Sequence, residues 1–189
     1  MAESAEIEQR VRRWLEQVVI GLNLCPFAAQ PLRENQLRIA VSEALDEEAL
    51  LADLHAELSL MDRTPARDLQ TTLLIAPRML ADFEAYNQLL DLVDALLDQF
   101  EWTGIYQVAS FHPGYRFADT GADDASNLTN RAPYPILHLL REESLDQALE
   151  HFPDPEQIPE RNIRRMEALS DDDKRRLFPY LFDGPQREA

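Results

Sequence analysis

The chain reads Ile105-Tyr-Gln-Val-Ala-Ser-Phe111 and, after a long polar segment, Ile136-Leu-His-Leu-Leu-Arg141, and these two runs decide its fold. The first run predicts a strand, in which alternation places Tyr106, Val108, Ser110 and His112 on one face. The second run predicts a fourth strand, although its last residues could also begin a helix. Ser144-Leu-Asp-Gln147 matches a helix capping box, so we expect a helix to begin at Ser144 in either case.

Short strands and helices alternate before these runs. Residues 37–41 and 71–76 predict strands, the second one fully buried. Residues 46–61 and 79–100 carry apolar side chains at steps of three and four, which predicts two amphipathic helices. An order of strand, helix, strand, helix, strand implies parallel neighbouring strands with right-handed connections. The fourth strand could join the sheet in either direction.

Helices are also predicted at both chain ends. Residues 5–22 form an amphipathic pattern, and Pro159 and Ser170 mark the starts of two later helices. We therefore predict an α/β fold, a single-domain sandwich with a four-stranded mixed sheet and helices at both chain ends. An α+β ferredoxin-like fold is the alternative. The domain is expected to cover residues 1–183, followed by a loose C-terminal tail at 184–189.

Composition and charge exclude several classes of protein. A net charge of −17 repels polyphosphates, so we expect no nucleic acid partner. No run approaches the roughly 20 apolar residues that span a bilayer, so we expect no membrane partner. The first residues are acidic and lack a signal core, and the single cysteine, Cys25, cannot form an internal disulfide. These features predict a cytoplasmic protein and leave its oligomeric state open.

The segment between the two decisive runs is the candidate site, because it concentrates hydrogen-bonding side chains on a loop. Histidine can act as an acid or base near neutral pH, and the arginine fork matches carboxylate or phosphate groups. The predicted function is that of a small-molecule enzyme that acts on an anionic metabolite at the 112–131 loop. The candidate catalytic residues are His112 and His138, and the candidate substrate-binding residues are Arg116, Asn127, Asn130, Arg131 and Arg141.

A non-catalytic binding or interaction domain is the alternative function. In that case Arg131 pairs with Asp119, Asp123 or Asp124 and holds the loop in place. The sequence does not decide whether the protein is an enzyme. A concave pocket that contains His112, Asn130 and Arg131 would favour the enzyme, and a filled loop would favour the alternative.

Cys25 and the histidines can also be considered as a nucleophile or as metal ligands. Cys25 follows a helix C-terminus, where the helix dipole opposes a thiolate, so we predict a structural cysteine. The sequence contains no closely spaced ligand pair such as Cys-x-x-Cys. We therefore predict no metal site and no cofactor.

Four segments resemble a known protein family. They are Leu22-Asn-Leu-Cys-Pro-Phe-Ala28, Ser110-Phe-His-Pro-Gly-Tyr-Arg-Phe117, residues 127–142, and Ile158-Pro-Glu-Arg-Asn-Ile163. The family is an uncharacterised bacterial one, domain of unknown function 1415. The resemblance covers nearly the whole chain and implies a bacterial origin. The resemblance implies no catalytic role for any individual residue.

Overall fold

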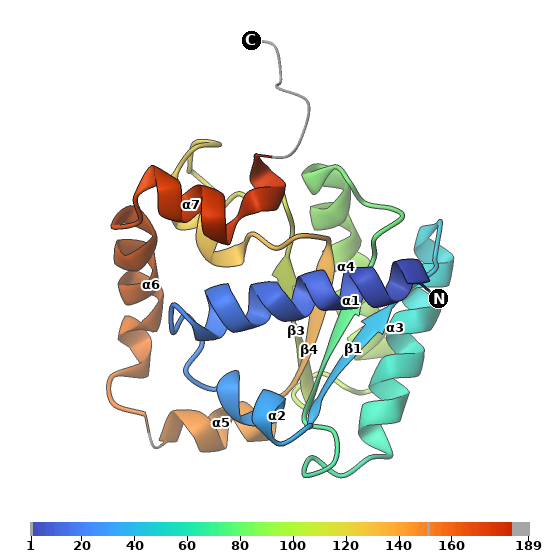
Figure 1. Cartoon of the computed structure of the whole chain (residues 1–189). Helices are drawn as coiled ribbons and strands as arrows, with labels where there is room; N and C mark the ends of the chain where they lie inside the picture. Colours follow the sequence, from blue (N-terminus) through green and yellow to red (C-terminus); the bar gives the residue numbers. More distant parts are fainter. Residues whose placement is uncertain (1, 151, 183–189) are drawn as a thin grey trace.

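A computed structural model describes residues 2–150 and 152–182 of the chain. It shows a four-stranded mixed sheet between two layers of helices (Figure 1). The predicted single-domain α/β fold is therefore confirmed, and the arrangement is the three-layer form of a sandwich. The predicted tail at 184–189 lies outside the described residues, and the boundary at 183 stays a prediction.

The sheet has the strand order β1-β2-β4-β3. These strands are β1 (Leu37–Val41), β2 (Thr71–Ile75), β3 (Tyr106–Phe111) and β4 (Ile136–Arg141). β1 and β2 are parallel neighbours, as predicted, whereas β4 runs antiparallel to both β2 and β3. The expectation of parallel neighbours is thus wrong for β2 and β3, because β4 lies between them. The long 112–135 segment gives the chain enough length to reverse and enter that gap.

One face of the sheet packs on α3 (Glu47–Asp62) and α4 (Phe83–Gln99). Each helix begins where an aspartate accepts a hydrogen bond from the first turn, Asp46 from the Ala49 N–H and Asp82 from the Ala85 N–H. The buried side chains between these helices and the sheet include Leu50, Leu54, Leu58, Met61, Leu74, Tyr86, Leu89, Val93, Leu137 and Leu139.

The other face is crossed by one long N-terminal helix (Figure 1). It starts as α1 (Ala2–Trp14) and continues as the π-helix η1 (Leu15–Ile20), which confirms the helix predicted over residues 5–22. Helices α6 (Ile158–Glu167) and α7 (Asp171–Leu177) belong to the same layer. The buried side chains of this face include Ile7, Val11, Trp14, Leu15, Val18, Leu73, Ile75, Ile136, Met166 and Phe178.

The remaining elements are short. They are α2 (Ala29–Arg33), α5 (Glu142–Glu150) and the 3₁₀ turns η2 (Ala125–Asn130), η3 (Pro155–Gln157) and η4 (Pro179–Leu181). α5 begins at Glu142, directly after β4, so the prediction of a helix start at Ser144 is wrong. The Glu142 N–H still donates to the Ile105 carbonyl at 3.0 Å, so the strand passes into the helix without a connecting loop. The predicted cap at Ser170 is confirmed, since its hydroxyl accepts from the Asp173 N–H at 3.1 Å.

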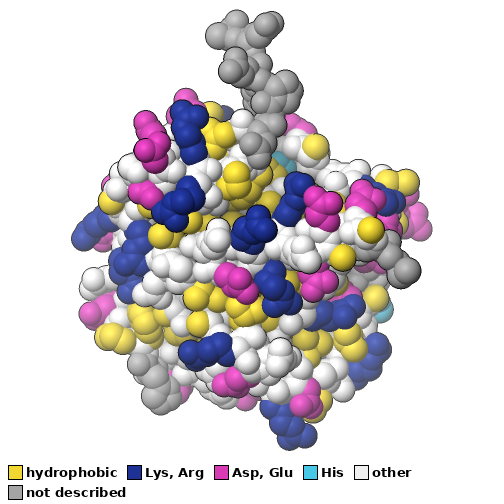
Figure 2. Space-filling view, in the orientation of Figure 1, with side chains coloured by type: hydrophobic (Ala, Val, Ile, Leu, Met, Phe, Trp, Pro, Cys, Tyr) yellow, Lys and Arg dark blue, Asp and Glu magenta, His cyan; other side chains and the backbone are white. Residues whose placement is uncertain are grey.

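Charges on the α1 face are mixed. Figure 2 shows basic side chains spread between acidic ones and hydrophobic patches on this face. Several arginines of α1, α6 and α7 pair with an acid on the same helix, namely Arg10 with Glu6, Arg12 with Glu8, Arg164 with Glu160 and Arg176 with Asp173. Over residues 2–150 and 152–182, no helix has both the length and the apolar character to cross a membrane.

Candidate functional site

The two candidate histidines lie on opposite faces of the sheet. His112 follows β3 and packs against Phe83 and Tyr86 on the α4 side, with ring centroids 5.4 Å and 5.1 Å away. His138 lies in the middle of β4, 6.1 Å from the ring of Phe111 on the α1 side. The structure therefore does not bring His112 and His138 into one site.

Both ring nitrogens of His112 form hydrogen bonds with backbone groups. Its Nε2 lies 2.8 Å from the Leu80 carbonyl, which can only accept, so Nε2 carries the proton. Its Nδ1 accepts from the Gly114 N–H at 2.9 Å. Burial lowers the pKa of His112, which keeps the ring neutral in this bonded form. No ring nitrogen remains free for a substrate proton.

The two candidate asparagines hold the loop together. Asn127 is fully buried, accepts from the Phe117 N–H and the Thr120 hydroxyl at 2.9 Å each, and donates to the Gly121 carbonyl at 2.8 Å. Asn130 donates to the Ser110 carbonyl at 3.1 Å. Asn127 therefore satisfies the backbone of a long loop, and Asn130 ties that loop to β3.

Arg131 and Arg116 meet at a hollow of about 540 Å³, which His112 also lines. Arg131 donates to the carbonyls of Tyr115 at 3.3 Å and Ala122 at 2.6 Å, and burial lowers its pKa. Arg116 is exposed and makes no ion pair or hydrogen bond with the described part of the chain. The acidic residues Asp82, Glu84 and Asp123 line the same hollow, so its charges are mixed.

Arg141 lies at the far end of β4 from Arg131, opposite Tyr106 in the register. Its guanidinium donates to the carbonyls of Met61, Thr64 and Leu69 and to the Tyr106 hydroxyl. Arg141 therefore holds the turn between α3 and β2 and does not join the loop residues.

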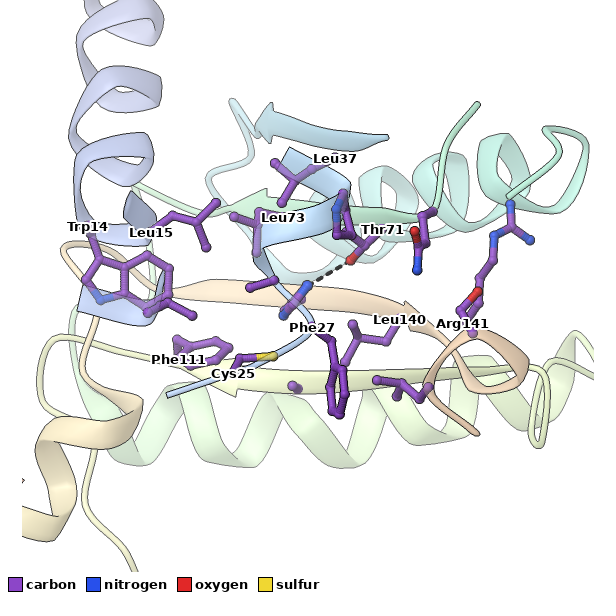
Figure 3. Close-up of a pocket in the computed structure, with 18 residues that line it drawn as sticks. Trp14, Leu15, Cys25, Phe27, Leu37, Thr71, Leu73, Phe111, Leu140 and Arg141 are labelled. Carbon is purple, nitrogen blue, oxygen red and sulfur yellow. Dashed lines mark hydrogen bonds between the residues drawn. The ribbon is translucent and has the colours of Figure 1, made fainter. Parts of the chain in front are cut away.

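A cavity of about 190 Å³ lies on the α1 side of the sheet, and we call it the His138 cavity (Figure 3). Trp14 and Leu15 come from the long helix, Cys25 and Phe27 from the turn that follows it, and Phe111 from β3. The floor is made of strand residues that share this face: Thr71, Leu73, Ala109, His138 and Leu140. Alternation along each strand places these side chains on one face.

The cavity beside His138 is mostly apolar. Nε2 of His138 lies 2.7 Å from the Thr71 hydroxyl, the contact drawn as a dashed line in Figure 3. Burial without a nearby carboxylate lowers the pKa of His138 to about 4, so the ring is uncharged at neutral pH. The sequence pointed to His138 as a candidate but not to the cavity, whose walls come from segments that are far apart in the sequence.

Cys25 lies in the wall between the His138 cavity and a second hollow. That second hollow, of about 490 Å³, runs between η2 and α6, and Val19, Cys25 and Phe111 line both spaces. Burial raises the pKa of the Cys25 thiol, which opposes formation of a thiolate. This environment suits the structural role predicted for Cys25.

Metal sites in proteins typically need three or four ligands that converge on one point. Across the described ranges, no group of three or more His, Cys, Asp or Glu residues is placed to hold a metal ion.

Comparisons with known proteins give a family and no activity. No curated protein and no solved structure matches the chain. A family model matches residues 6–176, which is most of the chain. The match includes the four segments noted in the sequence. The chain belongs to the family described as "Protein of unknown function (DUF1415)".

Proposed function

We propose that this protein binds a small organic molecule in the His138 cavity. The observation that supports the proposal is an apolar cavity of about 190 Å³ that contains one neutral histidine. Engineered apolar cavities of roughly 150 Å³ bind benzene, so the space suits a molecule with a single ring. It is smaller than the roughly 300–1,000 Å³ pockets that hold drug-sized ligands.

A ligand in the His138 cavity would cover apolar side chains of its wall. Burial of apolar surface contributes roughly 25 cal/mol per Å², so the apolar lining favours binding of an apolar group.

The π-helix η1 supports the same location. Its wider turn is seen in the bond from the Gly21 N–H to the Glu16 carbonyl, five residues back, at 2.9 Å. Leu15 and Val19 of η1 line the cavity. Short π-helical turns inside α-helices frequently occur at functional sites, because they place side chains that a regular helix would not.

Catalysis on an anionic metabolite at the 112–131 loop is the second candidate. Arg116 supports it, because this side chain is exposed in the hollow beside Arg131 without an ion pair among the described residues. The carboxylates in the hollow and the bonded ring of His112 weigh against it. If it holds, inorganic phosphate or citrate should perturb the amide signals of the loop, and Arg116→Gln should abolish the effect.

A cavity-filling variant tests the first proposal. Ala109 lies on the cavity floor, and Ala109→Leu places added carbon atoms in the space. Millimolar benzene should raise the melting temperature of the wild-type protein and leave that of Ala109→Leu unchanged. Ala52→Leu, at an exposed position of α3, is the matched control and should respond as the wild type does. No response of the wild type would refute a ligand-accessible cavity.

We also propose a bacterial origin and a cytoplasmic location. They are supported by the family resemblance and by Cys25, the single cysteine of the sequence, which is partly buried and free.

A further inference from the structure

We propose that the ligand of the His138 cavity is a neutral molecule with one aromatic ring and a hydroxyl or N–H group that donates a hydrogen bond to Nδ1 of His138. This inference rests on the proposed function, and it names the chemical class of the ligand. A phenol is the simplest molecule of that class.

The tautomer of His138 follows from Thr71. The Thr71 hydroxyl lies 2.7 Å from the Leu139 carbonyl and 2.7 Å from Nε2 of His138. A hydroxyl has one proton and a carbonyl can only accept, so Thr71 donates to Leu139. The contact with His138 then requires a proton on Nε2. Nδ1 of the neutral ring therefore keeps its lone pair.

That lone pair has no partner in the fold. Within residues 2–150 and 152–182, no donor forms a hydrogen bond with Nδ1 of His138. Nδ1 is also not among the fully buried polar atoms that lack a partner, so space remains beside it. The His138 ring lines the cavity, and we infer that Nδ1 presents its lone pair there.

The lining of the cavity excludes a charged ligand. Among the residues that the structure describes, no carboxylate lines the cavity, and the one cationic side chain in its wall is Arg141. The Arg141 guanidinium already donates to oxygens of Met61, Thr64, Leu69 and Tyr106. The half-buried His138 ring and the Cys25 thiol are both uncharged at neutral pH. Transfer of an unpaired ion from water into such surroundings is strongly unfavourable, whereas a neutral ligand loses little hydration free energy.

Aromatic side chains in the wall favour a ring. Trp14, Phe27 and Phe111 line the cavity, and Trp14 and Phe111 already meet edge to face with centroids 5.3 Å apart. Aromatic pairs prefer such edge-to-face or offset arrangements. A planar ring of the ligand can join this cluster while its donor reaches His138.

Three probes of nearly equal size test the inference by calorimetric titration of the full chain: phenol, benzene and anisole. Phenol should bind about three- to tenfold more tightly than benzene, the ratio expected of one net hydrogen bond. Anisole, which has an oxygen but no donor, should gain no such advantage. His138→Leu should remove the preference for phenol and leave benzene binding in place.

The outcomes separate this inference from the proposed function. Equal binding of phenol and benzene, or a preference for anisole, would overturn the inference while the cavity stays a binding site. No binding of any probe would refute the proposed function itself. A second readout needs no variant: the ¹⁵N resonances of His138 should show the Nε2–H tautomer, and phenol should shift the Nδ1 signal. An Nδ1–H tautomer in the wild type would overturn the inference without any titration.

Discussion

Substitution of His138 by glutamine should make the stability of the protein less sensitive to acid. The folded state holds the ring neutral with a pKa of about 4, compared with an ordinary value of 6.5. Above pH 6.5 both the folded and unfolded states are neutral at this position, and the folded state keeps its full stability. As the pH falls, the unfolded state takes up a proton that the folded state does not accept. The free energy of unfolding therefore decreases as the pH falls from the ordinary value towards the folded value.

The magnitude follows from the two pKa values. Between about pH 7.5 and about pH 5, one such histidine lowers the free energy of unfolding by roughly 2 kcal/mol. The Gln variant lacks this contribution, so the difference in stability between the wild type and His138→Gln should change by about that amount. His112 also has a lowered pKa and titrates in both proteins, so the comparison isolates His138. Urea unfolding of both proteins at the two pH values measures the difference.

A non-titrating change in the same cavity provides the control. Leu140→Ala enlarges the space beside His138 and should destabilise the protein by roughly 0.5–3 kcal/mol, because Leu140 is only partly buried. Its effect should be the same at both pH values. If the stability difference between His138→Gln and the wild type is also independent of pH, the ring is not held neutral and the reasoning from the cavity fails.

Three other changes test the fold around the site. Gly21→Ala should destabilise the protein by roughly 1–3 kcal/mol, because its Cβ would lie 2.4 Å from the Gln17 carbonyl, whereas Gly121→Ala, with nothing within 4 Å, should be nearly neutral. Asn127→Ala should lower the free energy of unfolding by at least about 2 kcal/mol, because buried backbone groups lose their hydrogen-bond partner. The loop should then be cleaved faster by proteases, and an unchanged rate of proteolysis would contradict this prediction. The Cys25 thiol should react with a disulfide reagent much more slowly in the folded than in the unfolded protein, and equal rates would refute its protection by burial.

Local patterns were sufficient to predict most of the elements. Alternation, short apolar runs and helical spacing predicted all four strands and the helices packed on them, because each of these segments buries one face or, in β2 and β4, side chains on both faces. These local patterns were not sufficient to predict the order of the strands in the sheet. β4 could enter between β2 and β3 or join the sheet at an edge, depending on where its apolar residues are buried. Ile136 and Leu137 point to opposite faces of the sheet, and both are buried. The sequence of a central strand that is buried on both faces does not indicate which strands lie beside it.

The candidate site was harder to predict for a different reason. The polar residues of the 112–131 segment were expected to bind a substrate, and the structure shows Asn127, Arg131 and His112 bonded to backbone groups of the fold. A long loop that packs on a core must satisfy its own N–H and C=O groups, and it does so with side chains of these types. A high density of polar residues is therefore expected of a structural loop as well as of a binding loop.

Unmet hydrogen-bonding capacity separates the two kinds of residue. His112 and His138 are both histidines next to a strand core, and both are neutral. His112 has a backbone partner on each nitrogen, so nothing is left for a ligand to recognise. Within the described part of the chain, the His138 ring has one hydrogen-bond partner, Thr71, and the His138 cavity lies beside the ring. That difference depends on the tautomer and on packing between separate segments of the chain, which is why it requires a structure, and it is the reason that we propose a binding site at His138.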